Sequence, residues 1–144
     1  MKKIFYIFAI LLFKTSIAYS LIEVDITRGN LDPLPVAISP LHVDPQSDNY
    51  QDIKTKELGE LISSVVEKNF RSTGLFNPLN KDAFVQKPDI AHLKPRFEDW
   101  SLITAQALVT GKLLLKDEKL KIEFRLWDVA ANKEMIALAF TTTP

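Results

Sequence analysis

Apolar residues recur at helical spacing in one stretch of the chain, residues 55–79. Six of them fall on a single helical face: Leu58, Leu61, Ile62, Val65, Val66 and Phe70. Offsets of three and four residues are typical of an amphipathic helix, and we predict one over Thr55–Phe70. Asp52 or Thr55 can cap its beginning. Gly74 is a suitable stop, because glycine readily adopts the left-handed conformation found at helix ends.

Most of the remaining pattern is typical of strands. Apolar and polar residues alternate over two segments, and three other segments are apolar enough for strands, which gives Leu21–Thr27, Leu34–Leu41, Ala107–Lys116, Leu120–Asp128 and Met135–Thr142. Proline cannot donate to a strand ladder, so Pro40 should end its strand or place it at an edge. The stretches 42–52 and 80–95 are expected to be loops or irregular, and Arg96–Thr104 a short second helix.

The order of these elements predicts an α+β domain with a mixed β-sheet of about five strands and helices packed on one face. A single long helix is little cover for such a sheet, so we expect the chain to lack its own C-terminal continuation. Trp127 falls on the polar side of its strand, away from Leu126 and its apolar neighbours. It is therefore a candidate contact residue.

The first twenty residues have the pattern of an export signal. Lys2 and Lys3 precede the apolar run Ile4–Phe13, and Ala18 and Ser20 occupy the −3 and −1 positions of a cleavage site after Ser20. A retained membrane anchor is the alternative, but a spanning helix needs roughly 20 apolar residues. We therefore expect residues 1–20 to be a cleaved signal peptide and residues 21–144 to form one domain in the periplasm.

Composition narrows the possible functions. The chain has 47% hydrophobic and 25% charged residues, which is typical of a globular protein. Removing the three lysines of residues 1–20 from the 18 basic residues leaves 15 against 18 acidic residues, a net charge of −3. A mildly acidic domain is a poor ligand for nucleic acid. The chain has no cysteine and no glycine-rich phosphate loop, which excludes thiol chemistry and common nucleotide sites.

The residues that could carry chemistry lack the partners that chemistry requires. His42 and His92 are isolated in the sequence, and we interpret both as exposed loop residues. Asp44, Asp48 and Asp52 recur every four residues without the alternate-residue spacing and glycine bend of a calcium loop. The other candidates lie on the predicted helix, where a charged, salt-bridged surface is the simplest interpretation: Glu57, Glu60, Ser63, Ser64 and Glu67. We predict no catalytic, cofactor-binding or metal-binding residue.

An interaction role remains. Cleavage after Ser20 would make Leu21–Ile26 a free chain end, with Leu21, Ile22, Glu23, Val24, Asp25 and Ile26 as candidate partner-binding residues. A strand-forming segment can add to the edge of a partner's sheet. Alternatively, this segment pairs within its own sheet.

Several stretches, taken in order, resemble the N-terminal domain of the TolB family, the periplasmic component of the Tol–Pal envelope system. The resemblance spans most of residues 21–140 and is most specific where a helix is followed by Gly-Leu-Phe and a proline. It rests on Ile22–Gly29, Pro35–Leu41, Ile62–Leu79, Phe97, Trp100, Ala105, Leu108–Lys112 and Phe124–Asp128. Residues 80–95 match loosely, and the family continues into another helix and a β-propeller that this chain lacks.

The resemblance implies a non-enzymatic adaptor that maintains outer-membrane integrity and supports envelope invagination during cell division, with a linked role in protein import. By position, Leu21–Ile26 would bind TolA, whereas binding of the lipoprotein Pal would require a propeller supplied elsewhere. The alternative function is a stand-alone periplasmic α+β module that regulates a cell-wall enzyme.

Overall fold

The computed structural model describes residues 32–143, apart from the side chain of Lys56. By its internal contacts the chain divides into Met1–Asn30 and Leu31–Pro144, and only the second unit is described below. The expected signal peptide, its cleavage residues Ala18 and Ser20, and the expected strand Leu21–Thr27 therefore lie outside the described residues.

The long amphipathic helix, α2, spans Ile53–Ser72 and so confirms the predicted element. The side chain of Asp52 caps it by accepting a hydrogen bond from the backbone N–H of Lys54. Gly74 follows with a φ of 70°, the left-handed conformation expected after a helix end. The chain then enters the sheet directly at Phe76, because the turn after α2 is only three residues long.

The described residues form a six-stranded mixed sheet in the order β3-β1-β4-β5-β6. β2 also pairs with β4, at residues that follow those paired with β1. Pairing of β1 with β3 and β4 is parallel, whereas β4, β5 and β6 form an antiparallel meander. The strands are β1 (Leu34–Ile38), β2 (His42–Val43), β3 (Phe76–Pro78), β4 (Ala107–Lys116), β5 (Lys119–Asp128) and β6 (Lys133–Thr142). The α+β class and the mixed sheet are confirmed; β2 and β3 were not predicted as strands.

β1 and β2 both pair with β4, although the chain is interrupted between them. Pro40 breaks the predicted strand, and the backbone N–H of Leu41 turns away to donate to the carbonyl of Gly59 in α2, at 3.2 Å. A side chain at position 59 would overlap the carbonyl oxygen of Leu41. Glycine at this helix position therefore allows α2 to approach the sheet closely, and pairing with β4 resumes at His42.

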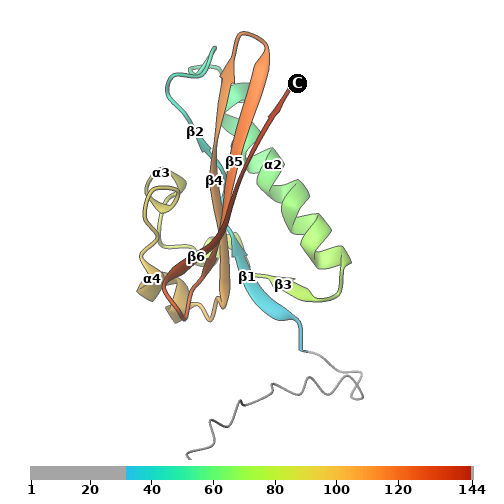
Figure 1. Ribbon diagram of the computed structural model, residues 1–144, viewed down its shortest axis with the longest axis vertical. Coiled ribbons are helices and arrows are strands. Elements are labelled where there is room, and N and C mark those ends of the chain that lie inside the picture. Colours follow the sequence, from blue (N-terminus) through green and yellow to red (C-terminus); the bar gives the residue numbers. More distant parts are fainter. Residues whose placement is uncertain (1–31, 144) are drawn as a thin grey trace, which may run out of the picture. The chain divides into compact units, whose positions relative to one another are not determined.

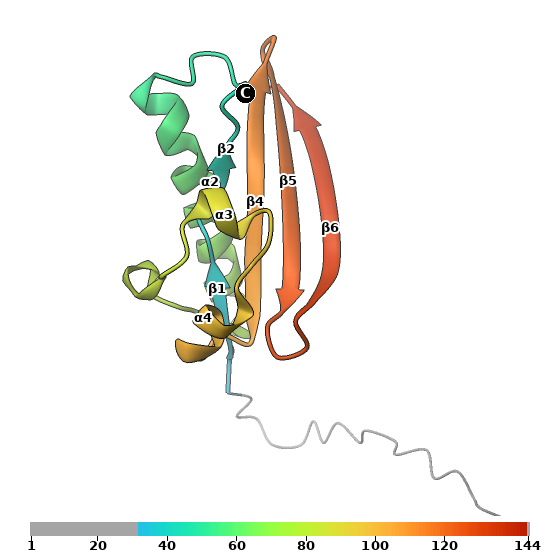
Figure 2. The same ribbon diagram turned by 90° about the vertical axis from the view of Figure 1, so that its left-hand side faces the viewer.

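The helices lie on both faces of the sheet, which corrects the prediction that they pack on one face (Figures 1 and 2). α2 covers one face, whereas α3 (Pro88–Ala91) and α4 (Phe97–Leu102) cover the other, and a short 3₁₀ helix, η1 (Lys81–Ala83), follows β3. The physical reason is that β1 and β4 are apolar on both faces, so that each of their faces requires a cover.

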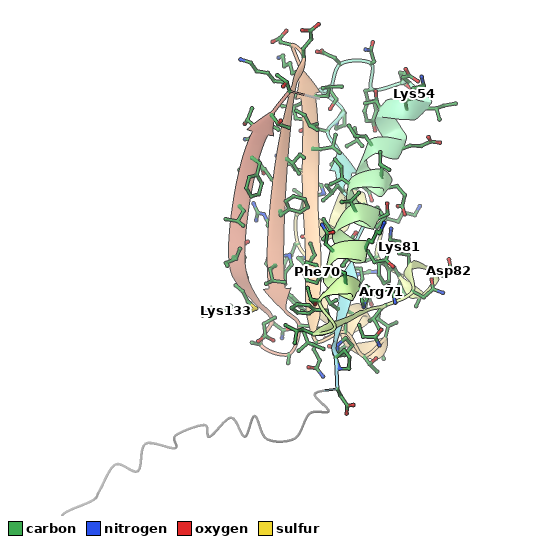
Figure 3. The ribbon with its side chains drawn as sticks, turned by 90° about the vertical axis from the view of Figure 1, so that its right-hand side faces the viewer. Lys54, Phe70, Arg71, Lys81, Asp82 and Lys133 are labelled. Atoms are coloured by element: carbon green, nitrogen blue, oxygen red, sulfur yellow. The ribbon has the colours of Figure 1, made fainter. Side chains whose placement is uncertain are left out.

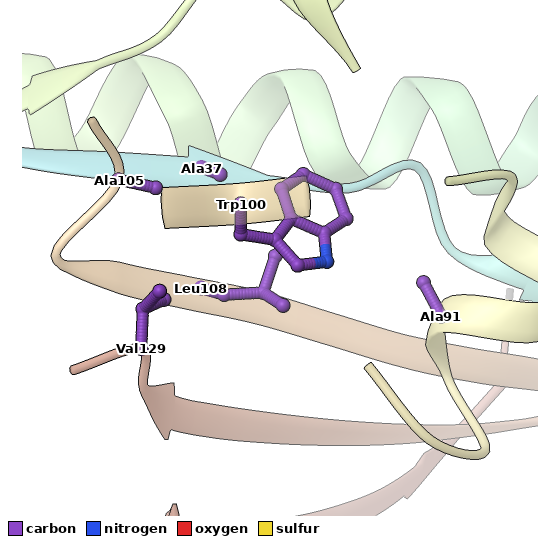
Figure 4. Close-up of a cluster of buried hydrophobic side chains, with 6 residues drawn as sticks. All are labelled: Ala37, Ala91, Trp100, Ala105, Leu108 and Val129. Atoms are coloured by element: carbon purple, nitrogen blue, oxygen red, sulfur yellow. The ribbon is translucent and has the colours of Figure 1, made fainter. Parts of the chain in front are cut away.

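The buried residues of β1 divide between these two layers. Val36 and Ile38 pack with Val66 and Phe70 of α2. Ala37, which points the other way, packs in the cluster around Trp100 of α4 (Figure 4). Because successive strand residues point to opposite faces, one short strand contributes to two cores. Trp100 is 1% exposed and is the largest fully buried side chain of the described residues.

Candidate interaction surfaces

The predicted partner-binding residues, Leu21–Ile26, lie outside the described residues, but the structure shows how the following segment enters the sheet. The backbone N–H of Leu34 donates to the carbonyl of Leu75 at 2.9 Å, where β1 begins. β1 is paired with β3 on one side and with β4 on the other. Both edges of β1 are therefore occupied by strands of the described sheet.

One flank of α2 carries the predicted ion pairs. The Lys81 ammonium of η1 lies 2.6 Å from Glu60 Oε1 and 3.8 Å from Glu67 Oε2, and Arg71 lies 3.0 Å from Glu67 Oε1 (Figure 3). Lys81 also donates to the buried hydroxyl of Ser63 at 3.2 Å. The salt-bridged surface predicted for this helix face is thus present, but its central cation comes from the segment after β3 rather than from α2 itself.

An apolar strip remains uncovered on the α2 face of the sheet, where β6 forms the outer strand (Figure 3). Ile136, Leu138 and Phe140 pair with Leu126, Phe124 and Ile122, which share that face, and each of the three is 52–53% exposed. We call these three residues the β6 strip. Helical geometry places the exposed Leu61 and Val65 on the flank of α2 opposite Ser63 and Glu67, beside the free part of the sheet.

Trp127 is not the outward contact residue that its strand position suggested. Its indole nitrogen donates to the hydroxyl of Thr110 at 2.8 Å, and its ring meets Phe97 edge-to-face with centroids 5.9 Å apart. The reason is that α4 covers the face of the sheet that the alternation of β5 marks as polar. Trp127 thus belongs to the packing around Trp100.

The two histidines are partners, which corrects their interpretation as separate exposed loop residues. His42 lies in β2 and His92 caps the C-terminal end of α3, and their rings stack with centroids 4.3 Å apart and planes 7° apart. Both are partly buried. Burial, followed by the neighbouring His92, lowers the pKa of His42. No sequence signal predicts this pair, because the two residues are fifty positions apart and lie in segments without periodicity.

The regularly spaced aspartates have structural roles. Asp52 caps α2, and Asp44 accepts from the backbone N–H of Gln46 at 2.9 Å. Asp48 accepts from the backbone N–H of Asp117 at 2.8 Å, at the tip of the β4–β5 hairpin. They hold the loop before α2 rather than a cation, and within residues 32–143 no three histidine or acidic side chains gather as metal ligands would.

The helix hydroxyls are likewise engaged within the fold. Ser63 donates to the carbonyl of Glu60 at 2.9 Å, and Ser64 donates to the carbonyl of Leu61 at 2.7 Å. Hydroxyls bonded back to their own helix are not poised as nucleophiles. No helix in the described part of the chain has the length and apolarity needed to cross a membrane.

Gln86 is a buried polar residue that no sequence pattern singles out. Its side-chain oxygen accepts from the indole nitrogen of Trp100 at 3.0 Å and from the backbone N–H of Arg96 at 2.9 Å. Its amide nitrogen donates to the carbonyl of Lys94 at 3.1 Å. This one amide therefore organises the segment from η1 to α4, which carries the loosely patterned residues 80–95.

Two solved structures have a similar fold. The crystal structure of TolB from Acinetobacter baumannii aligns with a TM-score of 0.56 and 16% identity, over 77% of this chain and 23% of that one. The LpoB C-terminal domain from Escherichia coli aligns with a TM-score of 0.56 and 7% identity, over 81% and 87% of the two chains. At these identities the likeness shows the fold alone.

Sequence comparison is more specific. Residues 22–135 match the family described as the TolB amino-terminal domain. The chain is 62% identical to the Tol-Pal system protein TolB of Pelagibacter ubique, over 100% of this chain and 32% of that protein. It thus spans about a third of the length of this relative. Since the family match covers most of its residues, the chain belongs to the family of TolB amino-terminal domains.

Proposed function

We propose that this chain is the amino-terminal part of a non-enzymatic adaptor of the Tol–Pal system. The observation that carries the proposal is the 62% identity to a Tol-Pal system protein along the entire chain. The adaptor acts in the periplasm after removal of residues 1–20. There it maintains outer-membrane integrity and supports envelope invagination during division, with protein import as a linked role.

The contact we propose is made by Leu21–Ile26 with TolA. Ile22, Val24 and Ile26 alternate with polar residues, as expected for a strand that adds to a partner's sheet edge. Pal binding belongs to the propeller of the longer protein and is not assigned to this chain.

A non-enzymatic role agrees with the chemistry of the described residues. Ser63 and Ser64 bond to helix carbonyls, and His42 stacks on His92. The carboxylates of Glu60 and Glu67 are engaged by Lys81 and Arg71. These groups stabilise structure, and none of these contacts joins a nucleophile to a base.

Capture of TolA by the chain tests this proposal. The mature chain and the same chain without Leu21–Ile26 are each incubated with purified TolA and recovered by an affinity tag at the C-terminus. If the mature chain recovers TolA and the shortened chain does not, the proposal is supported. Equal recovery by both chains contradicts the assignment of the segment, and recovery by neither contradicts the proposed TolA partnership.

The alternative is a stand-alone module that regulates a cell-wall enzyme. The likeness to the LpoB domain, at 7% identity, shows only that the fold is shared. The reading frame after Pro144 separates the two proposals. Sequence that encodes a β-propeller supports the Tol–Pal adaptor, whereas a stop codon followed by no propeller supports the stand-alone module.

A further inference from the structure

We propose that the stack of His42 on His92 is a pH-sensitive latch, which holds α3 against β2 while the ring of His42 is neutral and loosens when that ring takes up a proton. The rings come from segments fifty residues apart, lie 4.3 Å apart and are within 7° of parallel. The contact joins α3 to the part of the sheet where β2 pairs with β4. This inference goes beyond the proposed adaptor role and does not depend on it.

The geometry of the stack favours a neutral ring at His42. His92 Nδ1 lies 3.0 Å from the carbonyl oxygen of Pro88, and because that carbonyl can only accept, Nδ1 carries the hydrogen. Two imidazolium rings at this separation would repel each other, and partial burial weakens the screening by water.

The charged groups around the pair have opposite effects on the protonation of His42. Asp44, on the segment of His42, and Asp89 of α3 favour the protonated form of His42, whereas Lys112 of β4 disfavours it. Burial and the neighbouring His92 outweigh the two carboxylates, so that the pKa of His42 is lowered. Two small cavities flank the pair. The cavity beside His42 is also lined by Glu60, Tyr50 and Lys87, and the one beside His92 by Lys112, Glu123 and Arg125.

The segment that the latch would release is short. α3 has four residues, no side-chain cap at its beginning, and His92 at its end. Gln86 is bonded to the Lys94 carbonyl and the Arg96 N–H, and Ala91 is fully buried in the Trp100 cluster. These contacts fix the two ends and one side of the segment, so the loosening is confined to residues 87–93.

The direction of the pH effect follows from the lowered pKa. Above the ordinary histidine pKa both the closed and the open states are neutral at His42, and the latch is fully effective. As the pH falls through about 6.5, His42 binds a proton in the open state but remains neutral in the closed state. The equilibrium constant for closing then falls about tenfold per pH unit, because the open state binds one proton more than the closed state. The fall ends when the pH reaches the lowered pKa of His42.

Amide hydrogen exchange on the full chain tests the latch. Protection factors, which remove the intrinsic pH dependence of exchange, are measured at about pH 7.5 and about pH 5.5, on either side of the histidine range. The backbone N–H groups of Ala91 and His92, which bond to the carbonyls of Lys87 and Pro88, report on α3. The amide of Leu108, in the middle of the sheet, is the internal reference. We expect α3 protection to fall several-fold at the lower pH relative to this reference.

His42→Phe and His92→Phe are the matched variants, since each keeps an aromatic ring in the stack and removes one imidazole. In His42→Phe, α3 protection should become nearly independent of pH. In His92→Phe a weaker pH dependence should remain, because burial still lowers the pKa of His42. Equal pH dependence in the wild type and in both variants would overturn the proposal, as would unchanged α3 protection in the wild type. The wild-type measurement needs no substitution, so the proposal is tested even if a variant does not fold.

Discussion

The indole nitrogen of Trp100 donates a hydrogen bond of 3.0 Å to the side-chain oxygen of Gln86. Trp100 is the centre of the cluster that joins α4 to β1 and β4 (Figure 4). Gln86 is 4% exposed. The bond therefore connects the irregular segment before α4 to the core on that face of the sheet. A segment with little periodicity of its own is held by one polar side chain.

Replacing Gln86 with leucine should destabilise the domain by about 2–4 kcal/mol, because the indole of Trp100 and the amide of Arg96 lose their common acceptor. Urea denaturation followed by tryptophan fluorescence measures the change. Gln106→Leu is the matched control, since the side chain of Gln106 is exposed, and it should change the free energy of unfolding by less than about 0.5 kcal/mol. Equal losses in the two variants would contradict the role given to Gln86.

Two glycines should respond differently to alanine. Gly74 has a positive φ but open space where a side chain would lie, so Gly74→Ala should cost about 1 kcal/mol through backbone strain alone. Gly74→Asn should cost less, because asparagine tolerates the left-handed conformation. At Gly59 the added methyl group would meet the carbonyl of Leu41, and overpacking of this kind costs about 1–3 kcal/mol. Gly59→Ala should therefore have the lowest thermal unfolding midpoint of the three variants. A reversed order of midpoints would refute this explanation.

The β6 strip should contribute little to stability. Leu113 of β4 is fully buried, and Leu113→Ala should cost about 2–5 kcal/mol. Leu138→Ala removes the same atoms from a half-exposed position and should cost less than about 1 kcal/mol. The midpoint of urea denaturation gives both values. A loss at Leu138 as large as that at Leu113 would mean that the strip is covered in solution.

The ion pairs of Lys81 should add to the stability of the domain, and salt should weaken this contribution by screening the charges. Its ammonium contacts Glu60 and Glu67 on α2 while remaining 23% exposed, so Lys81→Met should cost about 0.5–1 kcal/mol at low ionic strength. The difference from wild type should shrink in about 1 M salt, where the Debye length is about 3 Å. Lys54→Met, on an exposed position of α2, is the control. A loss that does not change with salt would indicate packing of the lysine stem instead.

The elements with strong local periodicity were predictable from the sequence. α2 and β5 contain enough regularly spaced apolar residues to determine their type, and the segments of β4 and β6 are apolar enough to be predicted as strands. β2 and β3 have two and three residues, too few to show a period, and they are strands only because β4 and β1 offer them pairing edges. Tertiary pairing, rather than local sequence, decides their structure.

The face that each strand presents could not be assigned from alternation alone. In β5 the alternation assigns Trp127 to the polar side, yet α4 covers that side and Phe97 packs against the indole ring. The stack of His42 on His92 and the bonds of Gln86 are also contacts between distant segments. Their sequence neighbourhoods contain no pattern that specifies the partner, so these contacts become visible only in the folded chain.

The central claim is that the alternating segment Leu21–Ile26 binds TolA as a strand of a Tol–Pal adaptor, and the affinity of two triple variants tests it most directly. In one variant Ile22, Val24 and Ile26 become serine; in the matched control Glu23, Asp25 and Thr27 become serine. Isothermal titration of purified TolA should show at least about a tenfold loss for the apolar triple variant, because the side chains of one strand face supply the buried contacts. The control should remain within about threefold of wild type. Equal affinities for wild type and the apolar triple variant would contradict the claim.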